Sequence, residues 1–227
     1  RYPDFCAIAE VYWGVELHLQ HLGFQLTYDK ELYDAILARD LDRLVPRIRT
    51  PHAPLEASVR FLENHDETRA AVCFSDDQQE AALLAIATLP GTLLLHEGQT
   101  EGYCVRTPVQ LRRRHQEPGN PRLRHFYERF LTLPDVRQGH FAVLQPHAAC
   151  MGDDTYKALL SWAWVHESCC WLVVINYADH LSQGAINLAD LPLPAGVLRF
   201  RDRLHHSTYE QSRETVQHTG FPVVLPP

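Results

Sequence analysis

The sequence has no long apolar run, and this excludes a membrane-spanning helix. A helix that crosses a bilayer needs about 20 mostly apolar residues. The longest apolar run here, around residues 81–89, is rich in alanine and ends at Pro90-Gly91. The start of the sequence also has no secretory signal pattern, since residues 1–4 lead directly into an apolar segment. We therefore expect a cytoplasmic protein with no membrane partner.

Positive charge is also scarce. The sequence contains 21 Lys and Arg against 28 Asp and Glu, which gives a formal net charge of -7 at pH 7. Its one basic cluster, at residues 112–114, is short. Because proteins that bind nucleic acid depend on clustered Lys and Arg to contact phosphates, this balance argues against a nucleic-acid partner.

Metal-ligand spacing is missing as well. The six cysteines follow no zinc pattern, and the 14 histidines are scattered along the chain. Cys6 falls in an apolar segment, and Cys169 and Cys170 are adjacent, which favours buried thiols in a reducing compartment over a disulfide framework. We expect no metal site and no cofactor.

What the sequence does contain, in its first 133 residues, is an alternation of apolar strands and helices. With 227 residues, of which 45% are hydrophobic, the chain is long enough for one large domain or two smaller ones. Nearly continuous apolar strands separated by helices are typical of an α/β fold with a parallel sheet. Pro46, Pro51 and Pro54 predict a loop before the third strand. The expected strands are 5–9, 24–28, 59–62 and 92–96, and the expected helices are 15–22, 31–44 (broken near Asp40) and 78–89.

The pattern changes after a helix that Asn120 caps and that ends at Leu131. Short apolar segments then follow one another, separated by turn residues, and no helical periodicity lies between them. We therefore expect a small all-β domain, an antiparallel β-sandwich, in residues 134–227. Its expected strands are 141–144, 159–165, 171–176, 185–188, 197–200 and 223–225.

Polar side chains follow two of the apolar strands. Glu10 follows the first strand, and the run 63–67, which contains His65 and Asp66, follows the third. The carboxyl ends of parallel strands meet at one edge of a sheet, so we expect Glu10 and Asp66 to face one shared pocket. The alternative is that Asn64 and Asp66 are turn residues or a helix N-cap.

Two aromatic residues, Tyr12 and Trp13, directly follow Glu10. They offer a platform on which a sugar ring can stack. The alternative is that both pack beneath the helix that follows.

With these residues together, the chain resembles the α-amylase family, glycoside hydrolase family 13. Residues 8–10 resemble the end of the family's fifth barrel strand, 61–66 its seventh-strand motif, and 91–102 its eighth strand and the loop after it. The resemblance implies the second half, about strands 5–8, of a TIM-type (β/α)8 barrel in residues 1–133 and an antiparallel β-sandwich domain in residues 134–227. It also implies a fragment truncated at both ends.

The resemblance further implies part of a retaining α-glycoside hydrolase or transglycosylase that acts on an α-glucan or small α-glucoside. Glu10 is then the general acid and base, and Asp66 stabilises the transition state. The family's nucleophile, an Asp of the fourth strand, would lie upstream of Arg1, so the isolated chain is expected to be inactive. The same region would carry any calcium site, and calcium in the intact protein stays open. The implied substrate-binding residues are His65, Asn64, Tyr12 and Trp13.

Other interpretations stay open at this point. The missing half of the barrel could come from a partner chain. A non-catalytic carbohydrate-binding or interaction module of the same fold fits the same pattern. A metal-dependent hydrolase would use Glu63, His65, Asp66 and His96 as ligands, although their spacing matches no zinc pattern. Arg69 either orients Asp66 or Glu63 or lies at the surface. The oligomeric state is not predicted.

Overall fold

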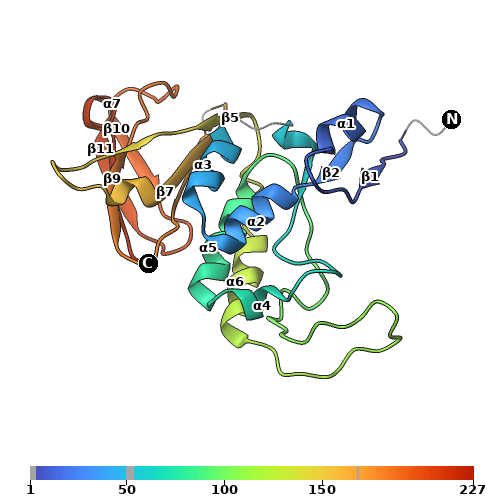
Figure 1. Ribbon diagram of the computed structural model, residues 1–227. Helices are drawn as coiled ribbons and strands as arrows, with labels where there is room; N and C mark the ends of the chain where they lie inside the picture. The colour runs from blue at the N-terminus through green and yellow to red at the C-terminus, as the bar shows by residue number, and fades with distance from the viewer. Residues whose placement is uncertain (1–3, 50–53, 168) are drawn as a thin grey trace. The chain divides into compact units, whose positions relative to one another are not determined.

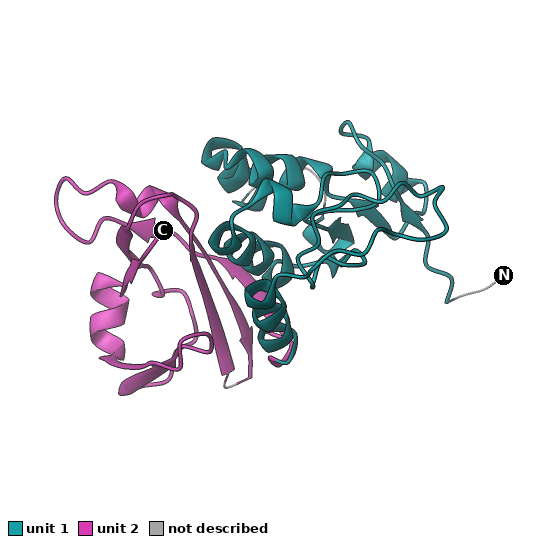
Figure 2. Ribbon diagram, turned by 90° about the horizontal axis from the view of Figure 1, so that it is seen from below, with its two compact units in different colours: residues 1–132 teal, residues 133–227 magenta. Residues whose placement is uncertain are grey.

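The computed structural model describes residues 4–49, 54–167 and 169–227. The chain divides into two compact units, residues 1–132 and 133–227 (Figure 2), and the sequence predicts a boundary one residue later. The first unit combines helices with a parallel sheet, and the second is built mainly from antiparallel strands. In the part of the chain that the structure describes, the parallel strands form an open sheet and not a closed barrel.

Four short strands of the first unit form one sheet in chain order. Each strand pairs in parallel with the next, for example with Thr27 opposite Ser58. Their carboxyl ends therefore lie along one edge, and the loops that follow β1, β3 and β4 leave from that edge. The strands are β1 (Ile8–Ala9), β2 (Leu26–Tyr28), β3 (Ser58–Arg60) and β4 (Thr92–Leu93).

The first strand is less buried than its sequence predicts. Only Ala9 is buried, whereas Phe5 and Ile8 are 71% and 52% exposed. The reason is positional: β1 is an edge strand that pairs with β2 alone. The expectation of buried thiols is wrong for a similar reason, because Cys6 precedes this strand. All six cysteines are free, and five of them, all but Cys73, are exposed.

Helices alternate with the strands along the first unit (Figure 1). The break predicted near Asp40 is present, because Arg39 takes a left-handed conformation with φ 52° and ends α2. Asn120 accepts hydrogen bonds from the first backbone amides of α6, as its position before Pro121 predicts. The helices are α1 (Glu16–His21), α2 (Lys30–Ala38), α3 (Leu41–Arg49), α4 (Ala70–Cys73), α5 (Asp76–Thr88) and α6 (Pro121–Leu131), with a 3-10 turn η1 (Leu55–Ala57).

The prediction of a loop at Pro46, Pro51 and Pro54 is wrong at Pro46. Pro46 lies inside α3, Pro51 lies outside the described residues, and Pro54 precedes η1. A proline inside a helix removes one backbone hydrogen bond. Burial of Leu44 and Ile48, which are 0% and 4% exposed, holds α3 in place despite this loss.

A buried charged cluster links α2, α3 and β3. Asp29 caps α2 by accepting a hydrogen bond from the Leu32 backbone amide. Its carboxylate also lies 2.9 Å from Arg47 Nη2 and 3.7 Å from Arg60 Nε. All three side chains are at most 7% exposed. The cluster therefore ties two helices to the strand that leads into the 63–67 segment.

The described residues of the second unit form three small antiparallel sheets. One has the order β5-β7-β8, another β12-β9-β6, and β10 pairs with β11. Buried side chains that include Leu144, Leu159 and Ile186 form its core. The strands are β5 (His140–Val143), β6 (Pro146–His147), β7 (Leu159–His166), β8 (Cys169–Asn176), β9 (Ser182–Ile186), β10 (Val197–Arg201), β11 (Thr208–Ser212) and β12 (Phe221–Leu225), with a 3-10 turn η2 (Thr155–Ala158).

One helix of this unit contradicts the expectation of an all-β domain. Helix α7 (Arg213–Thr219) begins after Ser212, whose side chain accepts a hydrogen bond from the Thr215 amide. Val216 is its one buried residue, so its sequence carries no apolar periodicity.

Among the described residues, no helix has the length and apolar character needed to cross a membrane.

Candidate active site

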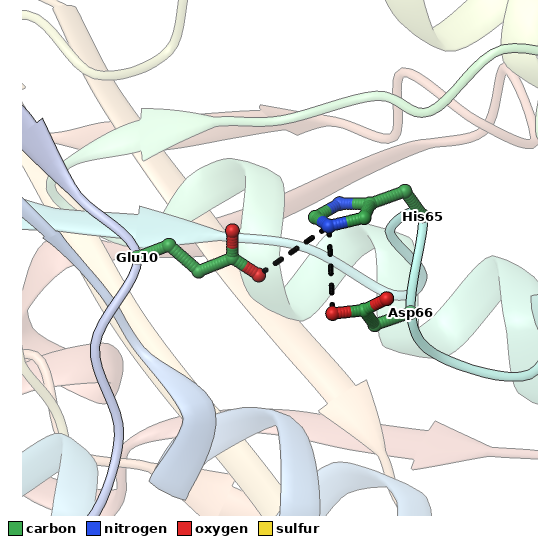
Figure 3. Close-up of side chains that lie close together, drawn as sticks. All are labelled: Glu10, His65 and Asp66. Carbon is green, nitrogen blue, oxygen red and sulfur yellow. Dashed lines mark ion pairs between the residues drawn. The ribbon is translucent and has the colours of Figure 1, made fainter. Parts of the chain in front are cut away.

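Glu10, His65 and Asp66 lie together at the carboxyl edge of the parallel sheet. His65 Nε2 is 3.8 Å from Glu10 Oε1 and 3.4 Å from Asp66 Oδ2. Figure 3 shows both carboxylates directed toward the same nitrogen of the imidazole. The three side chains are 37%, 39% and 59% exposed in that order. Two strand ends far apart in sequence thus deliver two solvent-accessible carboxylates to one histidine.

Asn64 holds the turn that presents His65 and Asp66. Its side-chain oxygen accepts hydrogen bonds from the backbone amides of Asp66, at 2.8 Å, and Glu67, at 2.9 Å. This is an Asx turn, in which a short side chain takes the place of a backbone acceptor. Asn64 is 2% exposed and supports the turn from beneath. Its predicted contact with substrate stays a prediction.

A buried carboxylate, that of Glu63, joins the beginning of the 63–70 segment to its end. Its Oε2 accepts a hydrogen bond from the Ala70 amide at 2.6 Å. Its Oε1 lies 3.1 Å from Arg69 Nη1 and 3.1 Å from His96 Nδ1. Burial raises the pKa of Glu63, while the Ala70 amide and Arg69 act in the opposite direction. The segment between Glu63 and Ala70 is therefore pinned at both ends.

Arg69 adds hydrogen bonds to two backbone oxygens, those of Tyr103 at 3.2 Å and Glu97 at 2.8 Å. Its side chain is 4% exposed. Arg69 therefore contacts and orients Glu63, which is one of its predicted roles, and it does not lie at the surface. It thereby joins the segment after β3 to the loop after β4.

The metal-ligand set considered from the sequence is not assembled. His96 contacts the buried carboxylate of Glu63, as just described, whereas His65 and Asp66 lie with Glu10. Among the described residues, the potential ligand atoms of Glu10, His65 and Asp66 lie within 4.8 Å of one another. Exposed acidic groups commonly gather in this way without a metal ion, so the cluster by itself does not indicate a metal site.

Tyr12 and Trp13 flank Glu10 in different ways. The Tyr12 hydroxyl donates a hydrogen bond to Glu10 Oε1 at 2.8 Å. Burial, together with this hydrogen bond and the charge of Glu10, raises the pKa of Tyr12, so the hydroxyl stays protonated at neutral pH. Trp13 is 90% exposed, has φ 72°, and meets Tyr12 edge to face at 5.6 Å between ring centroids. Trp13 therefore does not pack beneath the following helix, and its ring lies exposed next to Tyr12.

Sequence reasoning missed Arg106, which comes from the long irregular loop before α6 (Figure 1). Arg106 Nη2 lies 3.8 Å from Asp66 Oδ1. This loop has no apolar periodicity, so its sequence does not indicate which residue reaches Asp66. The pair places a positive charge on the side of Asp66 that faces this loop.

The fold of this chain resembles that of known structures. No protein-family model and no curated protein sequence matches the chain. Solved structures match over nearly its whole length. They include the maltogenic α-amylase AmyB from Thermotoga neapolitana, at 17% identity and a TM-score of 0.72, with 99% of this chain and 53% of that chain covered. The α-amylase GTA from Geobacillus thermoleovorans, complexed with acarbose, matches at 17% identity and TM-score 0.72, with 99% and 52% covered. AmyP in complex with maltose matches at 11% identity and a TM-score of 0.60, with 90% of this chain and 48% of that chain covered.

The chain therefore spans about half the length of these solved structures. At such low identity, this similarity establishes the fold alone. The predicted resemblance to α-amylases is confirmed at that level, and it covers both units of the chain.

Proposed function

We propose that this chain is the part of a retaining α-glycoside hydrolase or transglycosylase that supplies the general acid and grips the sugar. The observation that carries the proposal is the convergence of Glu10 and Asp66 on His65 at one edge of the parallel sheet. The fold shared with α-amylases supports it, and the acarbose and maltose bound to two of those structures support an α-glucan or small α-glucoside as substrate.

Glu10 is the proposed general acid and base. A retaining glycosidase protonates the leaving oxygen with one carboxylic acid while a second carboxylate, about 5 Å away, attacks the sugar. The acid then removes a proton from the incoming water. The hydrogen bond from Tyr12 orients Glu10, and partial exposure of the side chain lets it exchange protons with water. The nucleophile, by resemblance, comes from sequence upstream of Arg1.

Asp66 and His65 are the proposed sugar-binding pair. A carboxylate accepts hydrogen bonds from hydroxyl groups, and an imidazole can donate one beside it. As positive charge develops on the sugar ring in the transition state, nearby carboxylates become more favourable, which is how preorganised charge accelerates such a reaction. Trp13 offers its exposed ring to a sugar face.

The proposed function implies a fold assignment for both units. We assign β1–β4 to strands 5–8 of a (β/α)8 barrel and the second unit to a β-sandwich domain. Side chains fill every role described, so we propose no cofactor. We place the protein in the cytoplasm, where its six free cysteines stay reduced.

The isolated chain, without the nucleophile, is expected not to hydrolyse an aryl α-glucoside. Hydrolysis by the purified chain would contradict this expectation.

An activity assay on the protein that carries this chain tests the proposal. The wild type is expected to cleave α-glucosidic bonds, and Asp66→Asn to lower kcat/KM by about 100-fold or more, because it removes charge that acts in the transition state. Asp34→Asn, on the surface of α2, is the matched control and is expected to leave activity unchanged. A protein that binds α-glucans without cleaving them would instead be a non-catalytic binding module.

A further inference from the structure

The long loop that leads into α6 is closed at its base. The Cys104 amide donates a hydrogen bond to Glu117 Oε2 at 2.8 Å, and the Val105 amide donates to both oxygens of the same carboxylate at 3.1 Å. Just outside these contacts, the Asn120 amide donates to the Glu101 carbonyl oxygen at 2.7 Å. The two ends of the loop are therefore joined to each other independently of the chain between them.

The tip of this loop, residues 108–113, is open to solvent. Every residue of the tip is exposed, and the apolar side chains of Val109 and Leu111 are 62% and 59% exposed. The tip belongs to no helix or strand (Figure 1). Among its described residues, one backbone hydrogen bond is made, from the Leu111 amide to the Pro108 carbonyl oxygen. Exposed loop tips with so little internal bonding are preferred sites of proteolytic cleavage.

Two arginines that flank the tip are anchored to the rest of the first unit. Arg106 Nη2 lies 3.8 Å from Asp66 Oδ1. The guanidinium of Arg114 stacks over the ring of Tyr103 at 3.8 Å, and its Nε lies 3.2 Å from Glu97 Oε1. Each side chain would have to leave its partner before another molecule could bind it.

Two arginines within the tip are not anchored. Across residues 4–49, 54–167 and 169–227, neither Arg112 nor Arg113 has a hydrogen bond or an ion pair. No acidic residue lies between Arg106 and Glu117 in the sequence, so the tip has no negative charge of its own. A serine protease that has an aspartate in its specificity pocket binds an arginine side chain through that charge. The tip therefore offers such a protease two adjacent arginines on exposed backbone.

We propose that the tip is a cleavage site for an arginine-specific serine protease, at the peptide bond after Arg112 or Arg113. Hydrolysis adds one water across that amide bond, so the arginine gains a carboxylate and the next residue gains an amino group. The bond after Arg114 is a poorer substrate, because its side chain would have to leave Tyr103 and Glu97 to enter the protease pocket.

This cut leaves both pieces in one folded body. The downstream piece begins with the end of the loop and α6, in which Leu123 and Tyr127 are each 1% exposed. The Tyr127 hydroxyl accepts hydrogen bonds from Gln79 at 3.1 Å and Gln99 at 2.8 Å, both on the upstream piece. Together with the contacts of Glu117 at the loop base, these keep the cleaved chain assembled. The expected product is a nicked protein and not a degraded one.

Limited digestion with trypsin of the protein that carries this chain, followed by mass spectrometry, tests the proposal. The first cut within this chain is expected after Arg112 or Arg113. The cleaved protein is expected to elute with the intact protein in gel filtration and to separate into two pieces only in denaturant.

A pair of double variants identifies the residues that direct the cut. Arg112→Gln with Arg113→Gln is expected to slow the first cut at least about tenfold, because a pocket built for a charged side chain rejects one that lacks the charge. Arg199→Gln with Arg201→Gln, at two exposed arginines of β10, is the matched control and is expected to leave the rate unchanged.

Three results would overturn the proposal. The first is an initial cut elsewhere in this chain. The second is a variant without Arg112 and Arg113 that is cut as fast as the wild type. The third is a cleaved protein whose pieces separate without denaturant.

Discussion

His65 stands between two carboxylates because of a few local contacts. Asn64 fixes the turn in front of Asp66, and Glu63 anchors the segment to Arg69 and His96. A polar residue that sits in a buried network is held more rigidly than one on an open loop. The reactive groups are thus exposed, while the residues that position them are buried.

Trp13 yields a prediction at the scale of one side chain. Its ring is 90% exposed beside Glu10, and stacking of an aromatic ring contributes about 0.5–1.5 kcal/mol. In the protein that carries this chain, Trp13→Ala is expected to raise KM for an α-glucan about two- to tenfold with little change in kcat. Steady-state kinetics check this, with Tyr209→Ala in the second unit as control. An unchanged KM would remove Trp13 from the binding surface.

Glu63 yields a prediction about pH. Burial raises its pKa in the folded state, so the folded protein holds this proton more firmly than the unfolded chain does. Protonated Glu63 makes its full contribution to the free energy of unfolding below its ordinary pKa of 4.5. That contribution is lost as the pH rises through the higher pKa of the folded state. Glu63→Gln lacks this dependence. Its free energy of unfolding, relative to wild type, is therefore expected to increase as the pH rises from 4 to neutrality.

Urea unfolding of both proteins at several pH values measures this difference. The sign of the change with pH is the test, since Gln also loses charge-assisted contacts with Arg69 and His96. A difference that stays constant, or that falls with rising pH, would show that the pKa of Glu63 is not raised by burial.

At the scale of elements, local chemistry marked where a helix begins, and apolar runs located strands without revealing how exposed each one is. Asn120 before Pro121 marks the start of α6, and its side chain does cap that helix. The expected strand 5–9 is shorter and more exposed, because apolar sequence does not reveal which strand lies at a sheet edge. Helix α7 was missed because its single buried residue leaves no periodicity.

The same distinction applies to the candidate site. Glu10 and Asp66 were predictable because parallel strands bring their carboxyl ends to one edge. The positions of Arg106 and Tyr103 were not, because an irregular loop carries no repeating pattern. Burial of Glu63 was likewise hidden, since a charged residue in a polar run is ordinarily exposed.

The cluster of Asp29, Arg47 and Arg60 gives a prediction at this scale. Asp29→Asn keeps a helix-capping side chain but removes the negative charge shared by two buried arginines. Breaking a buried ion pair costs about 3–5 kcal/mol, so the free energy of unfolding is expected to fall by about that amount. Asp34→Asn, which breaks a partly exposed pair with Lys30, is the control and is expected to cost less than about 1 kcal/mol. Equal effects in the two variants would contradict the role given to the cluster.

At the scale of the whole molecule, the sheet of the first unit is open at β1, where Phe5 and Ile8 are exposed. An unpaired strand edge is normally covered by another part of a protein. The α-amylase structures that match this chain are about twice as long. Catalysis is therefore best measured in the protein that carries this chain, and the tests above are set in that protein.

The most direct measurement compares two substrates in the Glu10→Gln variant of that protein. Loss of a general acid costs about 10²–10⁴-fold in rate, but a leaving group that is already a stable anion needs no proton. Turnover of an α-glucan is therefore expected to fall at least about 100-fold. The initial burst of 2,4-dinitrophenolate from the corresponding aryl α-glucoside is expected to stay within about tenfold of wild type. Equal losses on both substrates, or wild-type turnover of the glucan, would show that Glu10 is not the acid.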